Sequence, residues 1–114
     1  MPDDTIAKTP EPPYYAVIFS SHLTGDDLQG YRTVANEMVK LAHAQPGFLG
    51  VESGARDPNT RLGITVSYWK DQAAILAWKQ QLAHRQAQDQ GRSKWYQSFR
   101  LRVAKVERDY GFER

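Results

Sequence analysis

One stretch near the start of the chain decides how the rest must fold: residues 14–20, which run Tyr14-Tyr15-Ala16-Val17-Ile18-Phe19-Ser20. The run is dense in aromatic and β-branched residues, which predicts a strand. Alternate side chains of a strand point to opposite faces, and here both faces are apolar. Because an apolar face must be covered, this strand predicts a sheet with a packed layer on each side.

A helix is predicted after this strand and ends at Pro46-Gly47. Thr24 is its candidate N-cap, with Asp27 three residues further on as a weak capping box. Apolar residues then recur at helical spacing through Ala44. They are Leu28, Tyr31, Val34, Met38, Leu41 and Ala42.

Two further strands are predicted at Phe48–Arg56 and Arg61–Trp69, around the turn Asp57-Pro58-Asn59-Thr60. In the second strand one face carries Leu62, Ile64, Val66 and Tyr68, and the other carries Gly63, Thr65, Ser67 and Trp69.

A second helix is predicted from Asp71, its candidate cap, to Gly91, with Ala74, Ile75, Trp78 and Leu82 on one side. The last strand is predicted at Gln97–Glu107. Its apolar residues change face at Ala104, so we expect a bulge or a change of burial there. The basic residues of this strand are expected to form a solvated edge.

The predicted order is β-α-β-β-α-β, which indicates an α+β, ferredoxin-like antiparallel sheet with its helices on one face. Two helices leave the other face uncovered, although the first strand is apolar there too. A second copy of the chain is the simplest cover, with two-fold symmetry as the default. We therefore expect a homodimer.

The composition fits one globular domain and excludes several kinds of site. The 114 residues include no cysteine, which removes disulfides, thiolate zinc sites and cysteine nucleophiles. Fifteen Lys and Arg against 13 Asp and Glu give a net charge of +2, too small to indicate nucleic acid or a membrane as partner. Residues 1–13 are expected to form a flexible tail and residues 14–114 the domain. With no signal peptide and no apolar run of ~20 residues, the cytoplasm is the default location.

Three longer stretches resemble the antibiotic biosynthesis monooxygenase family: PGFLGVESGARD at 46–57, GITVSYWKDQAAILAWKQQLAHRQAQ at 63–88 and WYQSFRLRVAKVERDYGFER at 95–114. The resemblance covers about Tyr14 to Arg114. It implies a dimeric α+β barrel with a pocket in each monomer between helices and sheet. Some members of this family oxidise polycyclic aromatic or quinol-like compounds with dioxygen and without metal or flavin, and others are stress-associated.

A neighbouring branch degrades haem and resembles this chain at Trp78. That branch also uses an asparagine on the first strand and a histidine ten residues after the tryptophan. Residues 14–21 contain no asparagine, and the tenth residue after Trp78 is Gln88. The missing orienting amide and the missing iron ligand argue against haem.

Four residues are candidates for a substrate site. Trp78 is either a core tryptophan or a pocket wall that stacks on a flat ring. His84 is either the base that accepts a phenolic proton or a solvated histidine; it shares a face with Trp78 only if the helix bends. Tyr96 and Tyr68 could each bind a substrate oxygen, or could be ordinary amphipathic tyrosines.

Other kinds of site lack their sequence pattern. No two histidines have metal-site spacing, and no glycine-rich phosphate loop or G-x-S-x-G elbow is present. An RNA-recognition strand would need rings where Gly63 and Thr65 stand. We therefore expect no metal, no cofactor and no nucleic acid.

The sequence supports two hypotheses of different classes. The first is a cofactor-independent monooxygenase that oxidises a small aromatic or quinol-type compound with dioxygen. The alternative is a non-catalytic dimeric module that binds a small molecule or serves in a stress response.

Overall fold

The structure is a computed structural model that describes the backbone of residues 6–88 and 92–114, and the side chains of these residues other than 83–88, 92 and 93. In chain order the elements are β1 (Tyr14–Leu23), α1 (Leu28–His43), β2 (Phe48–Ser53), β3 (Leu62–Trp69), α2 (Gln72–Gln88), α3 (Arg92–Trp95) and β4 (Tyr96–Val106).

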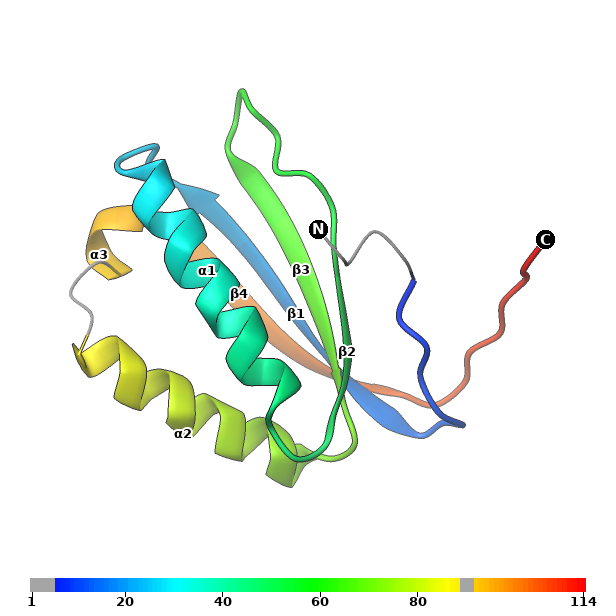
Figure 1. Cartoon of the computed structure of the whole chain (residues 1–114). Helices are drawn as coiled ribbons and strands as arrows, with labels where there is room; N and C mark the ends of the chain where they lie inside the picture. The colour runs from blue at the N-terminus through cyan, green and yellow to red at the C-terminus, as the bar shows by residue number, and fades with distance from the viewer. Residues whose placement is uncertain (1–5, 89–91) are drawn as a thin grey trace.

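The four strands form one antiparallel sheet in the order β2-β3-β1-β4. The first strand lies between β3 and β4, and β4 forms an edge. Both long helices lie on one side of the sheet, and the segments 6–13 and 107–114 lie on the other (Figure 1). This arrangement confirms the predicted α+β, ferredoxin-like fold.

The two faces of the sheet follow from the pairing register, because directly paired residues of neighbouring strands share a face. We call one the helix-side face: it holds Trp69, whose ring stacks on Trp78 of α2 with 5.9 Å between centroids. Trp69 pairs with Tyr15, and alternate positions along β1 from there, among them Phe19 and Ser21, lie on the same face. The open face holds the intervening residues of each strand.

Trp69 is the centre of the core and has no exposed surface. Its ring lies edge-on to Phe48 at 5.2 Å, and its indole Nε1 donates to Ser67 Oγ at 2.8 Å. A large aromatic ring with a satisfied indole N–H contributes strongly to stability, so Trp69 anchors the middle of α2 to the sheet through its stack on Trp78.

The first helix begins later than the capping box predicts. Its N-cap is Asp27, which adopts a left-handed conformation at φ 51° and accepts a hydrogen bond from Gly30 N at 3.2 Å. Thr24 instead accepts from Asp26 N and donates to the Lys94 carbonyl at 2.8 Å. The prediction of Thr24 as cap was therefore wrong, because that hydroxyl donates to a carbonyl of α3. Asp71 does cap α2, through Ala74 N at 2.8 Å.

The predicted turn at residues 57–60 is present, with Asp57 Oδ1 accepting from Asn59 N at 2.7 Å and Thr60 N at 3.0 Å. The predicted bulge in the last strand is not at Ala104, which pairs regularly with Ala16. The pairing of β1 with β4 shifts at the other end, between His22 and Leu23. Ala104 and Val106 lie on the open face, next to Ala16 and Tyr14 of β1, so the change of face needs no bulge.

The described part of the N-terminal segment lies against the sheet. Ala7 N donates to Glu52 Oε2 at 2.9 Å, and Thr9 Oγ1 donates to Tyr14 Oη at 3.0 Å. A Cβ added to Gly50 would lie 2.9 Å from Ala7 Cβ, so the segment crosses β2 closely. None of the described helices is long and apolar enough to cross a membrane.

Candidate functional site

An apolar surface that the helices leave uncovered lies on the helix-side face of β4. Phe99, Leu101 and Val103 are 42%, 49% and 47% exposed, although they face the side on which the helices lie. They pair with Ser21, Phe19 and Val17 of β1. We call Phe19, Tyr96, Phe99, Leu101 and Val103 the apolar wall. An exposed apolar surface of this kind, on the side of the sheet where the helices lie, is a candidate ligand site.

Rings make up one end of the apolar wall. Phe19 lies 5.8 Å from Tyr96 and 5.5 Å from Phe99, and Tyr96 lies 5.5 Å from Phe99. The predicted site residue Tyr96 is therefore part of an aromatic cluster between β1 and β4. This cluster and the exposed aliphatic residues offer a continuous surface for a flat apolar molecule.

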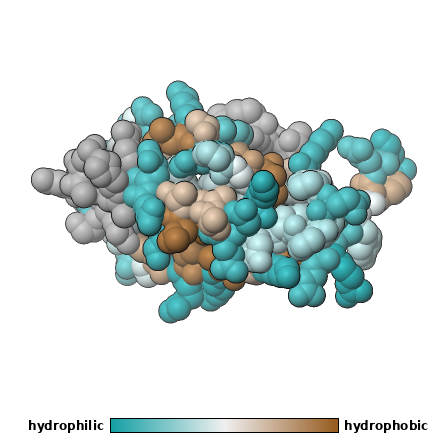
Figure 2. All heavy atoms as spheres, turned by 90° about the horizontal axis from the view of Figure 1, so that it is seen from below, coloured by the Kyte–Doolittle hydropathy of each residue, from teal (hydrophilic) through white to brown (hydrophobic). Residues whose placement is uncertain are grey.

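Trp78 lies in the core layer between α2 and the sheet, as one of the two interpretations of its position expects. Its ring stacks on Trp69 at an interplanar angle of 28°, and the residue is half-buried. The stack anchors α2 to the sheet. Viewed from below, apolar side chains gather in the middle of the molecule and are surrounded by hydrophilic ones (Figure 2).

Tyr31 of α1 connects the aromatic cluster to a cationic network. Its ring lies edge-on to Tyr96 at 5.8 Å and to Trp95 at 6.0 Å. Its hydroxyl accepts a hydrogen bond from Arg56 Nη2 at 3.2 Å, and the Arg56 guanidinium also lies 5.5 Å from the centre of its ring. No local sequence pattern identified this tyrosine, because its place on the apolar stripe of α1 is typical of a core residue.

Arg56 lies on the helix-side face over Gly63 of β3. A Cβ added to Gly63 would lie 2.6 Å from Arg56 Cζ, so only glycine leaves room for the guanidinium. Nη1 donates to the carbonyls of Ser21 and Arg61 at 2.8 Å each, and Nη2 donates to Ser21 Oγ at 3.1 Å. Every acceptor of this network is a neutral oxygen. Sequence reasoning missed Arg56 because its partners lie 25 and 35 residues away along the chain.

Tyr68 lies on the open face, away from the other predicted site residues. Its hydroxyl donates to Glu52 Oε1 at 2.8 Å, and its ring is edge-on to Tyr14 at 5.9 Å. Burial and the hydrogen bond to the Glu52 carboxylate raise the pKa of Tyr68 to about 12. The structure therefore brings Trp78 and Tyr96 to one side of the sheet and Tyr68 to the other.

His84 lies in α2, six residues after Trp78, and its side chain is outside the described residues, as is that of Gln88. Among the residues that the structure does describe, no group of three or more His, Asp or Glu side chains is arranged to hold a metal ion.

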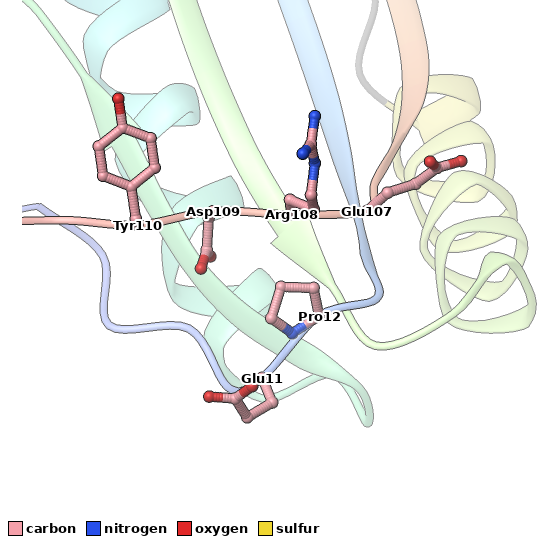
Figure 3. Close-up of a pocket in the computed structure, with 6 residues that line it drawn as sticks. All are labelled: Glu11, Pro12, Glu107, Arg108, Asp109 and Tyr110. Carbon is pink, nitrogen blue, oxygen red and sulfur yellow. The ribbon is translucent and has the colours of Figure 1, made fainter.

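A cleft of about 720 Å³ lies between the two terminal segments. It is lined by Glu11, Pro12, Glu107, Arg108, Asp109 and Tyr110. Glu11 and Asp109 point to the same side of this cleft, whereas Arg108 and Tyr110 point away from it (Figure 3). Asp109 accepts a hydrogen bond from the Tyr14 hydroxyl. Because the polar groups do not converge, the cleft has the features of a junction between terminal segments rather than of a ligand site.

Comparisons with known proteins place this geometry in a family. The family model described as antibiotic biosynthesis monooxygenase matches residues 13–90. The uncharacterized protein YqjZ of Bacillus subtilis is 54% identical over 110 residues, which cover 96% of this chain and 94% of YqjZ. The jasmonate monooxygenase ABM of Pyricularia oryzae is 27% identical over 94 residues, covering 81% of this chain and 43% of that longer protein.

Among solved structures, the protein SO0527 of Shewanella oneidensis has the same fold, with a TM-score of 0.69. The match covers 89% of this chain and 97% of SO0527 at 13% sequence identity, so it shows the fold alone. The family model matches more than half of the chain and the relative YqjZ is similar over nearly its whole length. The chain therefore belongs to the antibiotic biosynthesis monooxygenase family.

Proposed function

We propose that the protein is a cofactor-independent monooxygenase that oxidises a small aromatic or quinol-type compound with dioxygen. The observation that carries the proposal is the apolar wall, whose exposed side chains and adjoining rings suit a flat ring system. Membership of a family that contains monooxygenases supports the reaction class.

The proposed reaction needs no external reductant. A base removes a proton from an activated CH₂ or phenolic group, and the resulting anion transfers electrons to dioxygen. One oxygen atom then replaces the two hydrogens of the CH₂ as a carbonyl, and the other leaves with them as water. The substrate therefore supplies every electron, and an apolar site that excludes water protects the reactive intermediate.

Three residues receive roles in this proposal. Trp78 holds the substrate ring, and its half-buried position in a stack with Trp69 supports this role. Tyr96 orients the substrate, and its ring contacts with Phe19 and Phe99 within the apolar wall support this role. His84 is the candidate base, since imidazole titrates near neutral pH.

A homodimer in the cytoplasm completes the proposal. Leu62 and Ile64 lie on the open face and are 41% and 51% exposed. The described N-terminal segment lies over the Glu52 and Gly50 end of this face and not over these two residues. A second copy of the sheet would bury them, as an isologous two-fold contact requires.

Oxygen uptake is the experiment that tests the activity. The full-length protein, treated with a chelator, is incubated with anthrone-type and quinol substrates, and uptake is corrected for autoxidation. Product formed in proportion to the oxygen consumed above this background is expected. Saturable binding of the same compounds without any product would instead favour the alternative, a small-molecule-binding protein without turnover.

The role of His84 has its own test. His84→Ala should lower kcat by ~100-fold or more if the imidazole is the base, and should remove the neutral limb of the pH–rate profile. The matched control is His43→Gln, which changes an exposed histidine at the end of α1. An unchanged pH–rate profile in His84→Ala would remove His84 from the mechanism.

A further inference from the structure

Trp95 carries a polar atom that the fold leaves unpaired. The residue is 8% exposed, and within the described part of the chain its Nε1 is the only buried side-chain nitrogen or oxygen without a hydrogen-bond partner. Trp69 offers a direct comparison, because its buried Nε1 donates to Ser67 Oγ at 2.8 Å. A buried donor without an acceptor costs about 1–3 kcal/mol, so the unpaired indole N–H calls for an explanation.

A second donor with a spare proton lies beside it. The rings of Tyr31 and Trp95 are 6.0 Å apart at an interplanar angle of 78°. The Tyr31 hydroxyl oxygen accepts from Arg56 Nη2 at 3.2 Å, and among the described residues no acceptor receives its own proton. Because a hydroxyl that accepts from a cation is polarised, this O–H group is a stronger donor than an isolated phenol.

The cation behind Tyr31 has no counter-ion among the residues that the structure describes. Arg56 is half-buried and donates four hydrogen bonds, all to neutral oxygens. Arg61 lies next to it, with its Nε donating to the Leu23 carbonyl at 3.3 Å. The ion pair found within the described residues joins Lys94 and Asp27, so no described carboxylate neutralises either guanidinium. Two guanidinium groups without a described carboxylate partner therefore lie in this region of the fold.

We propose that Trp95, Tyr31 and Arg56 form a carboxylate-binding subsite at the aromatic end of the apolar wall, and that the substrate is a flat aromatic acid. The indole N–H of Trp95 and the hydroxyl of Tyr31 each donate to the carboxylate, and Arg56 supplies the positive field through Tyr31. The inference rests on the proposed function, because the wall must hold the ring of the same molecule.

The chemistry of the cluster selects a carboxylate over other oxygen groups. A carboxylate has two acceptor oxygens and one negative charge, which matches the two donors and the charge of Arg56 behind Tyr31. A phosphate group carries more charge and more acceptors than this cluster can satisfy. A neutral carbonyl would accept from one donor and would bring no negative charge to balance Arg56.

The subsite is continuous with the apolar wall through Tyr96. The ring of Tyr96 contacts Tyr31 at 5.8 Å on one side and Phe19 at 5.8 Å on the other. An aromatic acid that binds its carboxylate beside Tyr31 therefore directs its ring towards Phe99 and Leu101. The Trp95 Nε1 is enclosed in the free protein, so binding must shift a ring of this cluster.

The first experiment uses the indole protons. The chain has three tryptophans, so an isotope-labelled sample gives three indole N–H signals that Trp→Phe variants assign. We titrate the full chain with naphthalene-2-carboxylate and, separately, with the neutral naphthalene-2-methanol. The Trp95 signal should move downfield on saturation with the acid alone, while the Trp69 signal, already bonded to Ser67, stays in place.

The second experiment measures affinity for the same two probes by calorimetry. Trp95→Phe keeps a ring and removes the donor, and should weaken binding of the acid by about tenfold with little change for the alcohol. Arg56→Gln should remove the preference for the acid, and Tyr31→Phe should reduce it. Arg32→Gln, which changes an exposed arginine beside Tyr31 on α1, is the matched control and should leave the preference intact.

These outcomes separate the two proposals. A preference for the acid that Arg56→Gln abolishes, without oxygen uptake, supports the subsite and contradicts the monooxygenase. Oxygen uptake together with equal affinity for the acid and the alcohol supports the monooxygenase and contradicts the subsite. If Arg56→Gln weakens both probes equally, or the Trp95 signal does not move on saturation with the acid, the carboxylate subsite is wrong.

Discussion

The two faces of the sheet use tyrosines in opposite ways. On the open face the Tyr68 hydroxyl donates to Glu52, and the Tyr14 hydroxyl donates to Asp109. On the helix-side face the Tyr31 hydroxyl accepts from Arg56 and keeps its proton for another partner. Both of these open-face hydroxyls therefore donate to carboxylates of the fold, whereas on the helix-side face no described residue accepts from Tyr31 Oη or Trp95 Nε1.

This difference separates groups that hold terminal segments in place from groups available to a ligand. Glu52 accepts from both Tyr68 and Ala7 N, so the open-face network attaches the N-terminal segment to β2 and β3. No described segment satisfies the indole N–H of Trp95 on the other side. Burial alone does not distinguish the two regions, but the balance of donors and acceptors does.

The largest expected effect would come from a charge on the open face. Ile64→Asp places a carboxylate where we propose that two sheets meet, and an unpaired charge in an apolar interface costs several kcal/mol. The variant should be monomeric by light scattering at concentrations where the natural chain is dimeric. Leu101→Asp, on the other face, should remain dimeric and lose binding of naphthalene-2-carboxylate. A natural chain that is already monomeric would contradict the dimer.

An intermediate effect is expected from adding one methyl group beneath Arg56. In Gly63→Ala the new Cβ would lie 2.6 Å from Arg56 Cζ, so the guanidinium must move away from Ser21 and Tyr31. We expect a loss of about 1–3 kcal/mol in the free energy of unfolding, together with a weaker preference for the acid.

Chemical denaturation and the calorimetric comparison of the two probes measure these changes. The matched control is Gly54→Ala, since a Cβ added to Gly54 has no atom within 4 Å. If Gly63→Ala left both stability and the acid preference unchanged, the guanidinium would not be held over Gly63.

The smallest expected effect is on the pH dependence of stability, and it comes from Tyr68 on the open face. The pKa of Tyr68 is raised from 10.0 to about 12, so its contribution to stability is complete below about pH 10 and is lost as the pH rises towards about 12. In Tyr68→Phe the free energy of unfolding should therefore fall less steeply across this window. Below it the variant should be less stable by about 1 kcal/mol, because the bond to Glu52 is missing.

Denaturation curves at a series of alkaline pH values measure the slope. Part of the slope should remain in Tyr68→Phe, because the pKa of Tyr14 is also raised, by its hydrogen bond to Asp109. Tyr15→Phe, on the helix-side face, leaves the Tyr68–Glu52 pair intact and is the control. Identical slopes for the natural chain and Tyr68→Phe would count against the bond between Tyr68 and Glu52.

Much of the fold could be predicted from local patterns. The apolar run of β1, the turn at Asp57 and the Asp71 cap each depend on residues close together in the sequence. The predicted N-cap of α1 was wrong because the Thr24 hydroxyl donates to a carbonyl 70 residues away along the chain. Local propensity has no access to such a competitor.

The candidate site was less accessible to sequence reasoning. Trp78 and Tyr96 were predicted and lie on the side of the helices, but the strand pattern alone did not tell which face the helices would cover. Tyr68 precedes Trp69 and therefore points to the opposite face. Trp95 follows no helical or strand period that would single it out.

The sequence by itself determined the order of the main strands and helices and the two-sided burial of β1, because periodicity and turn chemistry depend on neighbours along the chain. The family followed from the resemblance of three longer stretches. Only the tertiary structure decided which polar groups are satisfied. Arg56, Tyr31 and Ser21 lie on three different elements or loops, and Trp95 Nε1 is unpaired only because of what surrounds it in space. A hydrogen bond depends on distance and direction between atoms, and the fold sets both.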